Sequence, residues 1–444
     1  MNNLHLLSKN KIIGKYLELE KENEALKKKN EFLEKEIRKY KNSNTPSSAH
    51  PHLKSNTSGL KAKKGAKRGA PKGHRGITRL WKETRDKVII KDKQCPNCQS
   101  HNIKDKNIKT GQQEEIPPDI EPEIVDVDRY EHECNECGFK WIARDNKTPL
   151  KGRLGINLMV LVIFLKFIVR GVLRKTAGFL EASFALKLAP ASINAILTRA
   201  AEATTKEYEQ IKERIRKSIM VYIDETSFSV NGKKWWVWVF RSETDILYVI
   251  RKSRGSNVLK EILGENYAGT VICDCWRAYD FLIFANIQRC WAHLLRKSKE
   301  LCTSVAGRHF HEKLKKLFEQ IEPFNLKERT EKQRARKYKQ MTAKLKSIID
   351  YYSKYEDCQS VVKYIDNHLK SWFTCIKIAG IQPTNNFAEQ PIREPVMVRK
   401  IIGAFRSEKG TQTYETLASL IATWQFNKLD LKQELRRVLT AHLC

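Results

Sequence analysis

The sequence predicts a multidomain protein whose largest part is a mixed α/β core, preceded by a coiled coil, a cysteine-rich module and a helical region. Three observations support this fold class: a heptad repeat that begins near residue 12, two Cys-X-X-Cys pairs, and a change from helical to strand periodicity at Ser218. The chain has 444 residues, which is enough for about two to four domains at roughly 150 residues each. We therefore expect several separately packed units.

Charge indicates the chemical class of the partner. The chain holds 83 Lys and Arg against 51 Asp and Glu, a formal net charge of +32, so a polyanion such as nucleic acid is expected. The longest apolar run, Leu158–Val169, contains Lys166 and is shorter than the roughly 20 residues of a membrane span. Met1–Asn10 has no secretory pattern. We expect a cytoplasmic protein whose cysteines bind metal rather than form disulfides.

Residues 12–42 carry the heptad repeat. One row of the repeat is apolar, and the second contains two Asn, which lower the stability of a coiled coil but favour two strands in a single register. We expect a parallel coiled coil and hence a homodimer or larger assembly, with a solvated single helix as the alternative. The two rows are Leu19, Leu26, Leu33 and Tyr40, and Tyr16, Asn23, Asn30 and Ile37.

Residues 43–82 lack periodicity and form a basic linker. A segment of this kind is unfolded by itself and binds phosphates through counterion release. A linker that only raises solubility is the alternative. The cations of the linker include Lys61, Lys63, Lys64, Lys67 and Arg68.

Residues 83–148 contain the paired cysteines Cys95, Cys98, Cys134 and Cys137. Two such pairs supply four thiolates, the ligand set of a closed structural Zn²⁺ site. We interpret the segment as a zinc-ribbon-like module with strands in Ile116–Tyr130. Four unligated thiols are the alternative.

Residues 150–217 follow a helical pattern. Leu173–Ala185 and a second helix that begins at Pro190 resemble a helix-turn-helix, which would bind DNA. A helical hairpin without DNA contact is equally consistent with the pattern. The second helix would present Ser192, Asn194, Thr198 and Arg199.

Residues 218–410 form the expected core. A strand over Ile219–Ile223 ends in Asp224, a β-meander follows over Trp235–Phe240 and Ile246–Ile250, and a further strand, Gly269–Cys273, ends in Asp274. Neighbouring strands would bring the two carboxylates to one sheet edge. Carboxylate oxygens suit Mg²⁺ or Mn²⁺, and a third acid is expected from the helix that carries Glu389.

These segments together resemble the transposases of the insertion sequence 66 family. The resemblance rests on Asp224-Glu225-Thr226, on Cys290-Trp291-Ala292-His293-Leu294-Leu295-Arg296, and on Asn385-Asn386 through Glu389 and Arg393 to Arg399-Lys400. It implies a ribonuclease H-like catalytic domain with an Asp-Asp-Glu triad, here Asp224, Asp274 and Glu389, which holds Mg²⁺. His293 and Arg296 would be the family's basic pair. We expect DNA contacts from this pair and from Arg393, Arg399 and Lys400.

Three departures from the family pattern stand out. Gln390 replaces an expected Arg beside Glu389, and Arg393 is the candidate substitute. Cys275-Trp276-Arg277 follows Asp274 where the family pattern has a small, glycine-like segment. A Lys-rich helical insertion occupies about residues 300–375, and it would add a basic surface for DNA. Residues 411–444 form an amphipathic helical cover without catalytic groups.

The expected function is that of a nucleoid-associated DNA transposase. It would cut double-stranded DNA at element ends and transfer the freed strand to target DNA by two-metal phosphoryl transfer. Two alternatives use the same residues: a metal-dependent nuclease without strand transfer, and a DNA-binding protein derived from a transposase without catalysis.

Overall fold

The computed structural model describes residues 18–20, 22–27, 29–31, 33, 83–84, 87–104, 108, 110 and 120–444. The described residues between 18 and 33 are helical, and Leu19, Leu26 and Leu33 are 46–59% exposed. This is the expected helix with its apolar row, while the pairing of two chains through it stays a prediction. Lys61, Lys63, Lys64, Lys67 and Arg68 lie outside the described residues.

A short antiparallel hairpin surrounds the second cysteine pair. Strand β1, Glu131–Glu133, pairs with β2, Lys140–Ile142. The prediction of strands within Ile116–Tyr130 is wrong over residues 120–130, which the structure describes and which form no strand. Pro122 and the acidic residues of this stretch disfavour a strand, and its contact with the hairpin is limited to its end, where the Tyr130 carbonyl accepts from the N–H of Ala143.

Within residues 150–217, four helices precede the central sheet, as the periodicity predicts. They are α2 (Ile156–Phe167), α3 (Leu173–Phe184), α4 (Pro190–Ala203) and α5 (Thr205–Lys217). Helix α4 begins at Pro190, where the missing N–H of proline costs no hydrogen bond. Asn194 is exposed, whereas Ser192, Thr198 and Arg199 are half-buried. DNA binding by this helical hairpin stays a prediction.

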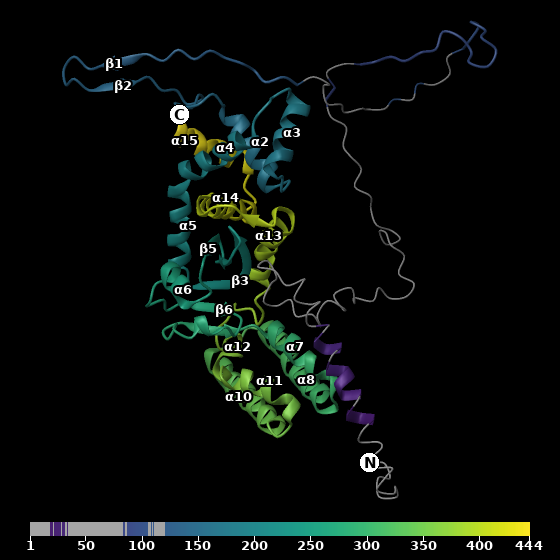
Figure 1. Cartoon of the computed structure of the whole chain (residues 1–444), viewed down its shortest axis with the longest axis vertical. Helices are drawn as coiled ribbons and strands as arrows, with labels where there is room; N and C mark the ends of the chain where they lie inside the picture. The colour runs from purple at the N-terminus through teal and green to yellow at the C-terminus, as the bar shows by residue number, and fades with distance from the viewer. Residues whose placement is uncertain are drawn as a thin grey trace, which may run out of the picture.

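A mixed sheet occupies the centre of the molecule (Figure 1), with strand order β5-β4-β3-β6-β7. Strands β3, β4 and β5 form an antiparallel meander, and β6 and β7 run parallel to β3. Asn231 and Gly232, both with positive φ, form the tight turn between β3 and β4. The strands are β3 (Met220–Val230), β4 (Lys233–Arg241), β5 (Ile246–Arg251), β6 (Thr270–Cys273), β7 (Asn286–Arg289) and β8 (Ala404–Phe405), the last paired with β3.

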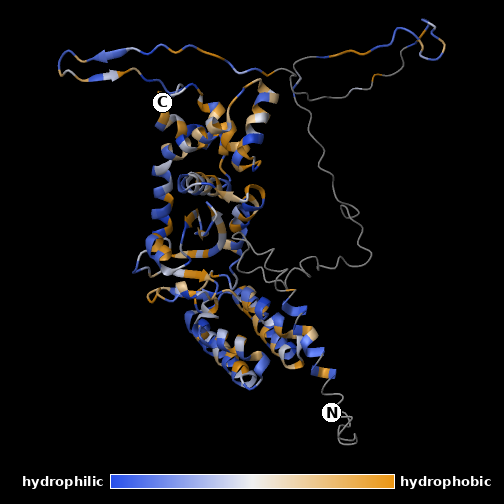
Figure 2. Ribbon diagram, in the orientation of Figure 1, coloured by the Kyte–Doolittle hydropathy of each residue, from blue (hydrophilic) through white to orange (hydrophobic). Residues whose placement is uncertain are grey.

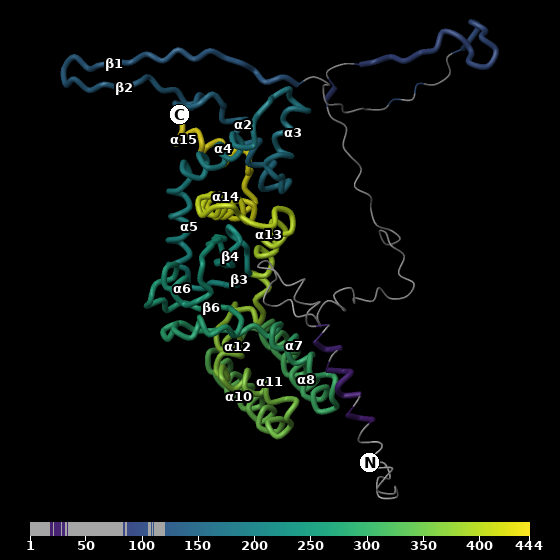
Figure 3. The backbone as a smooth tube through the Cα atoms, viewed as in Figure 1, coloured from purple at the N-terminus to yellow at the C-terminus, as the bar shows by residue number. Residues whose placement is uncertain are grey.

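The helical insertion forms a lobe at the end of the sheet opposite α2–α4, as the backbone trace in Figure 3 shows. It enters after α7 (Trp291–Lys299) and returns to α13 (Asn386–Ile402). Its helices mix hydrophilic and hydrophobic residues (Figure 2), as expected for helices with one buried face. The main helices are α8 (Val305–Phe318), α9 (Ile321–Asn325), α10 (Glu331–Tyr352), α11 (Gln359–Asp366) and α12 (Thr374–Lys377).

The C-terminal helices are α14 (Glu408–Phe426) and α15 (Leu431–Leu443), and α14 is more than a cover. It is buried on most sides, and its polar side chains bind the backbone of edge strand β5. Thr423 Oγ1, Ser419 Oγ and Glu415 Oε2 accept hydrogen bonds from the N–H groups of Ile246, Tyr248 and Ile250. These bonds protect an edge that would otherwise present unpaired groups. The remaining helix between β5 and β6 is α6, Ser256–Leu263.

We expect Glu415→Gln to stabilise the protein most at high pH. Burial raises the pKa of Glu415 to about 7 despite Arg251 and the bond from Ile250, whereas an unfolded Glu titrates near ~4.3. The folded state therefore binds more protons between these values, and its stability falls as pH rises through this window. Thermal melts at pH 5 and pH 8 should show a larger gain in Tm for the variant at pH 8. Exposed Glu408→Gln is the matched control, and an equal gain at both pH values would contradict the argument.

Candidate active site

The pairing of β3 with β6 brings Asp224 and Asp274 together. Tyr222 pairs with Ile272 in the parallel register, and two residues further along the same register Asp224 falls beside Asp274. Strand β6 ends at Cys273, whereas β3 continues to Val230 because β4 pairs with it over its whole second half. The prediction that Asp224 ends its strand is therefore wrong. Asp224 lies in mid-strand, at the point where the parallel neighbour stops.

Asp224 also lies between two apolar clusters on one sheet face. Tyr222 belongs to the cluster of the helical insertion, and Phe228 belongs to the cluster beneath α13 and α14. Because side chains alternate along a strand, Asp224 shares this face with them and Glu225 points to the other face. The pKa of Asp224 is raised well above its ordinary value by burial first, and then by the negative charges of Glu225, Asp274 and Glu389. Asp274 and Glu389 thus act electrostatically on Asp224, although in the described residues the three acids do not gather their oxygens within 4.8 Å of one another.

Asn385 ties the helix of Glu389 to the sheet. Its side-chain Nδ2 donates to the carbonyl of Ile223 at 2.7 Å, next to Asp224, and its backbone N–H donates to Cys290 Sγ at 3.1 Å. The Asn385 side chain is fully buried. Glu389 lies in the first turn of α13, and its own N–H donates to the carbonyl of Asn385. This arrangement explains how a residue more than a hundred positions from Asp274 reaches the sheet.

Two nitrogen-bearing side chains of α7, His293 and Arg296, face Glu389. Its Oε1 lies 3.8 Å from His293 Nδ1 and 3.9 Å from Arg296. Burial, followed by the charge of Arg296, lowers the pKa of His293, which favours the neutral imidazole. Within the described part of the chain, Glu389 Oε1 and His293 Nδ1 are both buried without a hydrogen-bond partner. These atoms are available to a ligand or an ion.

Cys290 completes a compact group with this pair. Ligand atoms of Cys290, His293 and Glu389 lie within 4.8 Å of one another. However, burial raises the pKa of the Cys290 thiol to about 11, and its sulfur already accepts a bond from Asn385. The thiol is therefore better suited to packing the core and orienting α13 than to ionising.

Sequence reasoning missed the partners of Glu225. Arg254 binds the Glu225 carboxylate at 2.7 Å and lies 3.9 Å from Asp274, and Tyr279 donates to Glu225 at 3.0 Å. Burial and the charge of Asp274 raise the pKa of Glu225 to about 7. Arg254 follows a strand as one of three nearby cations, in Arg251-Lys252-Ser253-Arg254-Gly255. No motif or spacing marks it, so a pattern search could not have found it.

One predicted DNA contact is wrong. Arg399 is 4% exposed, and its guanidinium donates to Thr226 Oγ1 and to the carbonyl of Ser227 in β3. It holds α13 against the sheet and does not face solvent. Helical periodicity explains the difference, because Arg393 and Lys400 lie on the outer side of the same helix and are exposed. Those two residues remain accessible to DNA.

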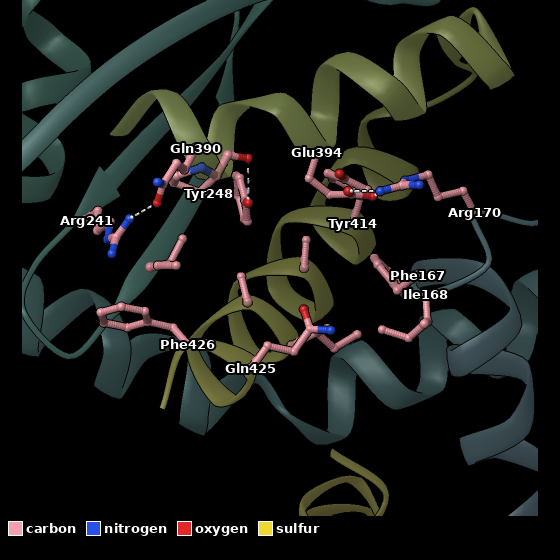
Figure 4. A pocket seen from close by; sticks show the side chains of 15 residues that line it. Phe167, Ile168, Arg170, Arg241, Tyr248, Gln390, Glu394, Tyr414, Gln425 and Phe426 are labelled. Atoms are coloured by element: carbon pink, nitrogen blue, oxygen red, sulfur yellow. Dashed lines mark hydrogen bonds and ion pairs between the residues drawn. The ribbon is translucent and has the colours of Figure 1, made fainter. Parts of the chain in front are cut away.

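Gln390 takes part in a different contact on α13. Its Oε1 accepts from Arg241 NH1 at 3.2 Å, and the Arg241 guanidinium stacks on Phe387 and Phe426. Both Gln390 and Arg241 line a cavity of about 430 Å³ between α13 and α14, which the Arg170–Glu394 ion pair also borders (Figure 4). The cation that contacts Gln390 is therefore Arg241 of β4. A role for Arg393 as the substitute for the Arg expected beside Glu389 stays a prediction.

The carboxylates suit a hard divalent cation. Asp224, Asp274 and Glu389 offer oxygen atoms as ligands, and Glu389 has an unpartnered buried oxygen. Burial first, and then repulsion from the neighbouring acids, raises the pKa of Asp224. A bound cation would relieve that repulsion. The residues therefore fit the metal that the resemblance implies.

Each cysteine pair forms a tight turn typical of metal-binding knuckles. Gln99 N–H donates to the Cys95 carbonyl, and Gly138 N–H donates to the Cys134 carbonyl. Backbone N–H groups of Cys98 and Cys137 lower the pKa of Cys95 and Cys134, which favours the thiolate. In the described residues the two pairs do not meet as one group of ligands. A shared Zn²⁺ site stays a prediction.

The mixed α/β core and its helical region fit the catalytic domain of a DDE transposase. A family model described as "Transposase IS66 family" matches residues 151–413. The chain belongs to this family, which confirms the resemblance found in the motifs. A search of curated proteins found no match. Among the described helices, none is long and apolar enough to cross a membrane.

We expect Arg399→Leu to destabilise the fold, because it removes the buried guanidinium that donates to the Thr226 hydroxyl and to the Ser227 carbonyl. The loss should be about 1–3 kcal/mol of unfolding free energy, measured by urea denaturation. Lys400→Leu, one residue away and exposed, is the control and should change stability little. Equal stability of the two variants would show that the contacts of Arg399 contribute little.

Proposed function

We propose that this transposase cuts its element ends and joins the freed 3′ hydroxyl to target DNA by two-metal phosphoryl transfer. The observation that carries the proposal is the electrostatic action on Asp224 in β3 of two acids from separate elements, Asp274 after β6 and Glu389 in α13. Two divalent cations, when bound there, would supply Lewis-acid stabilisation of the attacking and leaving oxygens.

The residues around the acids have separate tasks in this proposal. Asp224 and Asp274 come from adjacent strands, so the sheet holds their spacing rigid. Glu389 closes the site from α13, and the neutral His293 orients its carboxylate from 3.8 Å. Arg296, whose side chain is 40% exposed, is placed to bind a DNA phosphate beside the acids. Arg254 forms an ion pair with Glu225, whose side chain points to the opposite face of β3 from Asp224.

A wider set of cations would hold the DNA. Arg393 and Lys400 lie on the exposed side of α13, close in sequence to Glu389. Helix α10 of the insertion adds exposed cations over a further surface, among them Lys332, Arg336, Lys339 and Lys344. The basic linker residues Lys61, Lys63, Lys64, Lys67 and Arg68 would bind phosphates without reading sequence. Double-stranded DNA is thus the proposed partner at several surfaces.

The N-terminal parts complete the proposal. Cys95, Cys98, Cys134 and Cys137 would bind one structural Zn²⁺, and the module so formed, with the helical region, would recognise the element end. The heptad repeat would pair two chains, so that both ends are held in one complex. The assembly would be a homodimer or larger.

Two other functions compete with transposition by strand transfer. A nuclease would use the same acids but would never join strands. A DNA-binding derivative without catalysis would not need Asp274 and Glu389 so near Asp224 that they help to raise its pKa. The retained cluster of acids therefore favours catalysis over simple binding.

We expect Glu389→Gln to abolish joining of labelled element-end DNA in Mg²⁺ or Mn²⁺. Loss of a direct metal ligand should lower the rate at least about 100-fold, beyond the 10–100-fold typical of residues behind a ligand, while DNA binding is retained. Asp224→Asn and Asp274→Asn should behave alike, and exposed Glu408→Gln is the control. Cleavage without joining by the wild type would support the nuclease, and binding without cleavage would support the DNA-binding protein.

We expect the purified chain to contain about one Zn²⁺ per molecule, since four thiolates complete one tetrahedral site. Cys134→Ser should lower the zinc content and loosen the cysteine-rich module, as measured by metal analysis and limited proteolysis. Cys302→Ser, outside both pairs, is the control. Unchanged zinc content in Cys134→Ser would refute the shared site.

A further inference from the structure

Trp276 exposes an aromatic ring beside the acidic site. It lies two residues after Asp274, and 38% of the residue is exposed. A single exposed aromatic residue is common at protein surfaces, so its meaning depends on its surroundings. The position of this ring next to a proposed metal ligand raises the question of what covers it.

The ring is held in one orientation. The backbone N–H of Trp276 donates to Asp274 Oδ1 at 2.9 Å, and its indole Nε1 donates to the carbonyl of Arg254 at 2.9 Å. The Arg254 guanidinium lies 4.1 Å from the ring centroid, so it covers one face. Because the Nε1 bond and the Arg254 guanidinium hold the indole, and the bond to Asp274 holds the backbone that carries it, a ligand that stacks on the ring would lose little free energy in ordering the side chain.

The surroundings of the ring are cationic. Arg254 lies against Trp236 as well, 4.8 Å from that ring, and Lys234 lies 5.0 Å from Trp236. Arg277, the next residue after Trp276, is exposed. Aromatic rings combined with Arg and Lys form the usual platform for a nucleobase and its phosphate.

We propose that Trp276 stacks an unpaired nucleobase adjoining the phosphodiester at the acidic site, with Arg277 against the neighbouring phosphate. The inference rests on the proposed function, because the position of the stacked base depends on which phosphodiester bond the acids cleave. In intact duplex both faces of a base are covered by its neighbours, so the stacked base must be unpaired or displaced. The structure thus assigns a locally opened DNA end as the substrate class.

The experiment measures stacking without chemistry. The full chain, in the Glu389→Gln background, is titrated with element-end duplexes that carry the fluorescent base 2-aminopurine at single positions around the cleavage site. Stacking on an indole quenches this base, so one position should lose fluorescence on binding. A duplex with an unpaired base at that position should bind more tightly than the fully paired one, because the cost of opening is removed.

Two substitutions separate stacking from a structural role. Trp276→Ala should abolish the quench and weaken binding of the unpaired-end duplex about 10-fold. Trp276→Phe keeps an aromatic face but loses the indole bond to Arg254, so it should retain most of the binding. If Trp276 only supports Arg254, both variants should fail alike. Phe284→Ala, an exposed aromatic in the same connection at 58%, is the matched control and should bind normally.

The outcomes distinguish the two proposals. A quench that Trp276→Ala removes and Trp276→Phe keeps supports the stacking site, even if the wild type joins no strands. Tight binding with no quench at any position, or equal loss in both variants, overturns it and leaves the transposition proposal to the joining assay. Equal affinity for paired and unpaired ends would likewise refute an opened end as the substrate.

Discussion

The parallel pairing of β3 with β6 is the interaction on which the site depends. It sets Asp224 beside Asp274. Because β6 ends at Cys273 while β4 keeps β3 extended, the two acids lie where β3 loses its parallel neighbour. A helix from the far end of the core is directed to the same point. Asn385 binds the backbone of β3 one residue before Asp224 and so directs α13 and Glu389 to the same place.

Bringing acids together has an electrostatic cost, which the fold offsets only in part. Arg254 forms an ion pair with Glu225 on one face of β3. Two residues of α7, His293 and Arg296, lie 3.8 Å and 3.9 Å from Glu389 of α13. The pKa of Asp224 nevertheless stays raised by burial and by its acidic neighbours. A site with this residual repulsion is prepared for divalent cations, which is the physical link between the fold and the proposed chemistry.

The two ends of the sheet are supported differently. At the β5 edge, polar side chains of α14 bind backbone groups that a strand would otherwise pair. Near β7, the insertion packs its own apolar cluster around Trp291 and Trp372. The insertion can therefore be long without disturbing the site, because its own helices supply most of this cluster, Tyr222 and Ile272 join the cluster to the sheet, and Asn385 fixes the return point. Its exposed cations then extend the basic surface beyond the acids.

The sequence by itself determined β3, β4, β5 and β6, the turn at Gly232, most helices and the family, because periodicity, strong turn residues and short motifs are local signals. It also supplied the three acids as a proposal. Tertiary structure decided what depends on contacts between distant segments. Arg254 reaches Glu225, Asn385 reaches β3, and Arg399 turns inward while Lys400 turns out. A linear pattern states which residues are present, but only the packed chain decides which of them face each other and which face solvent.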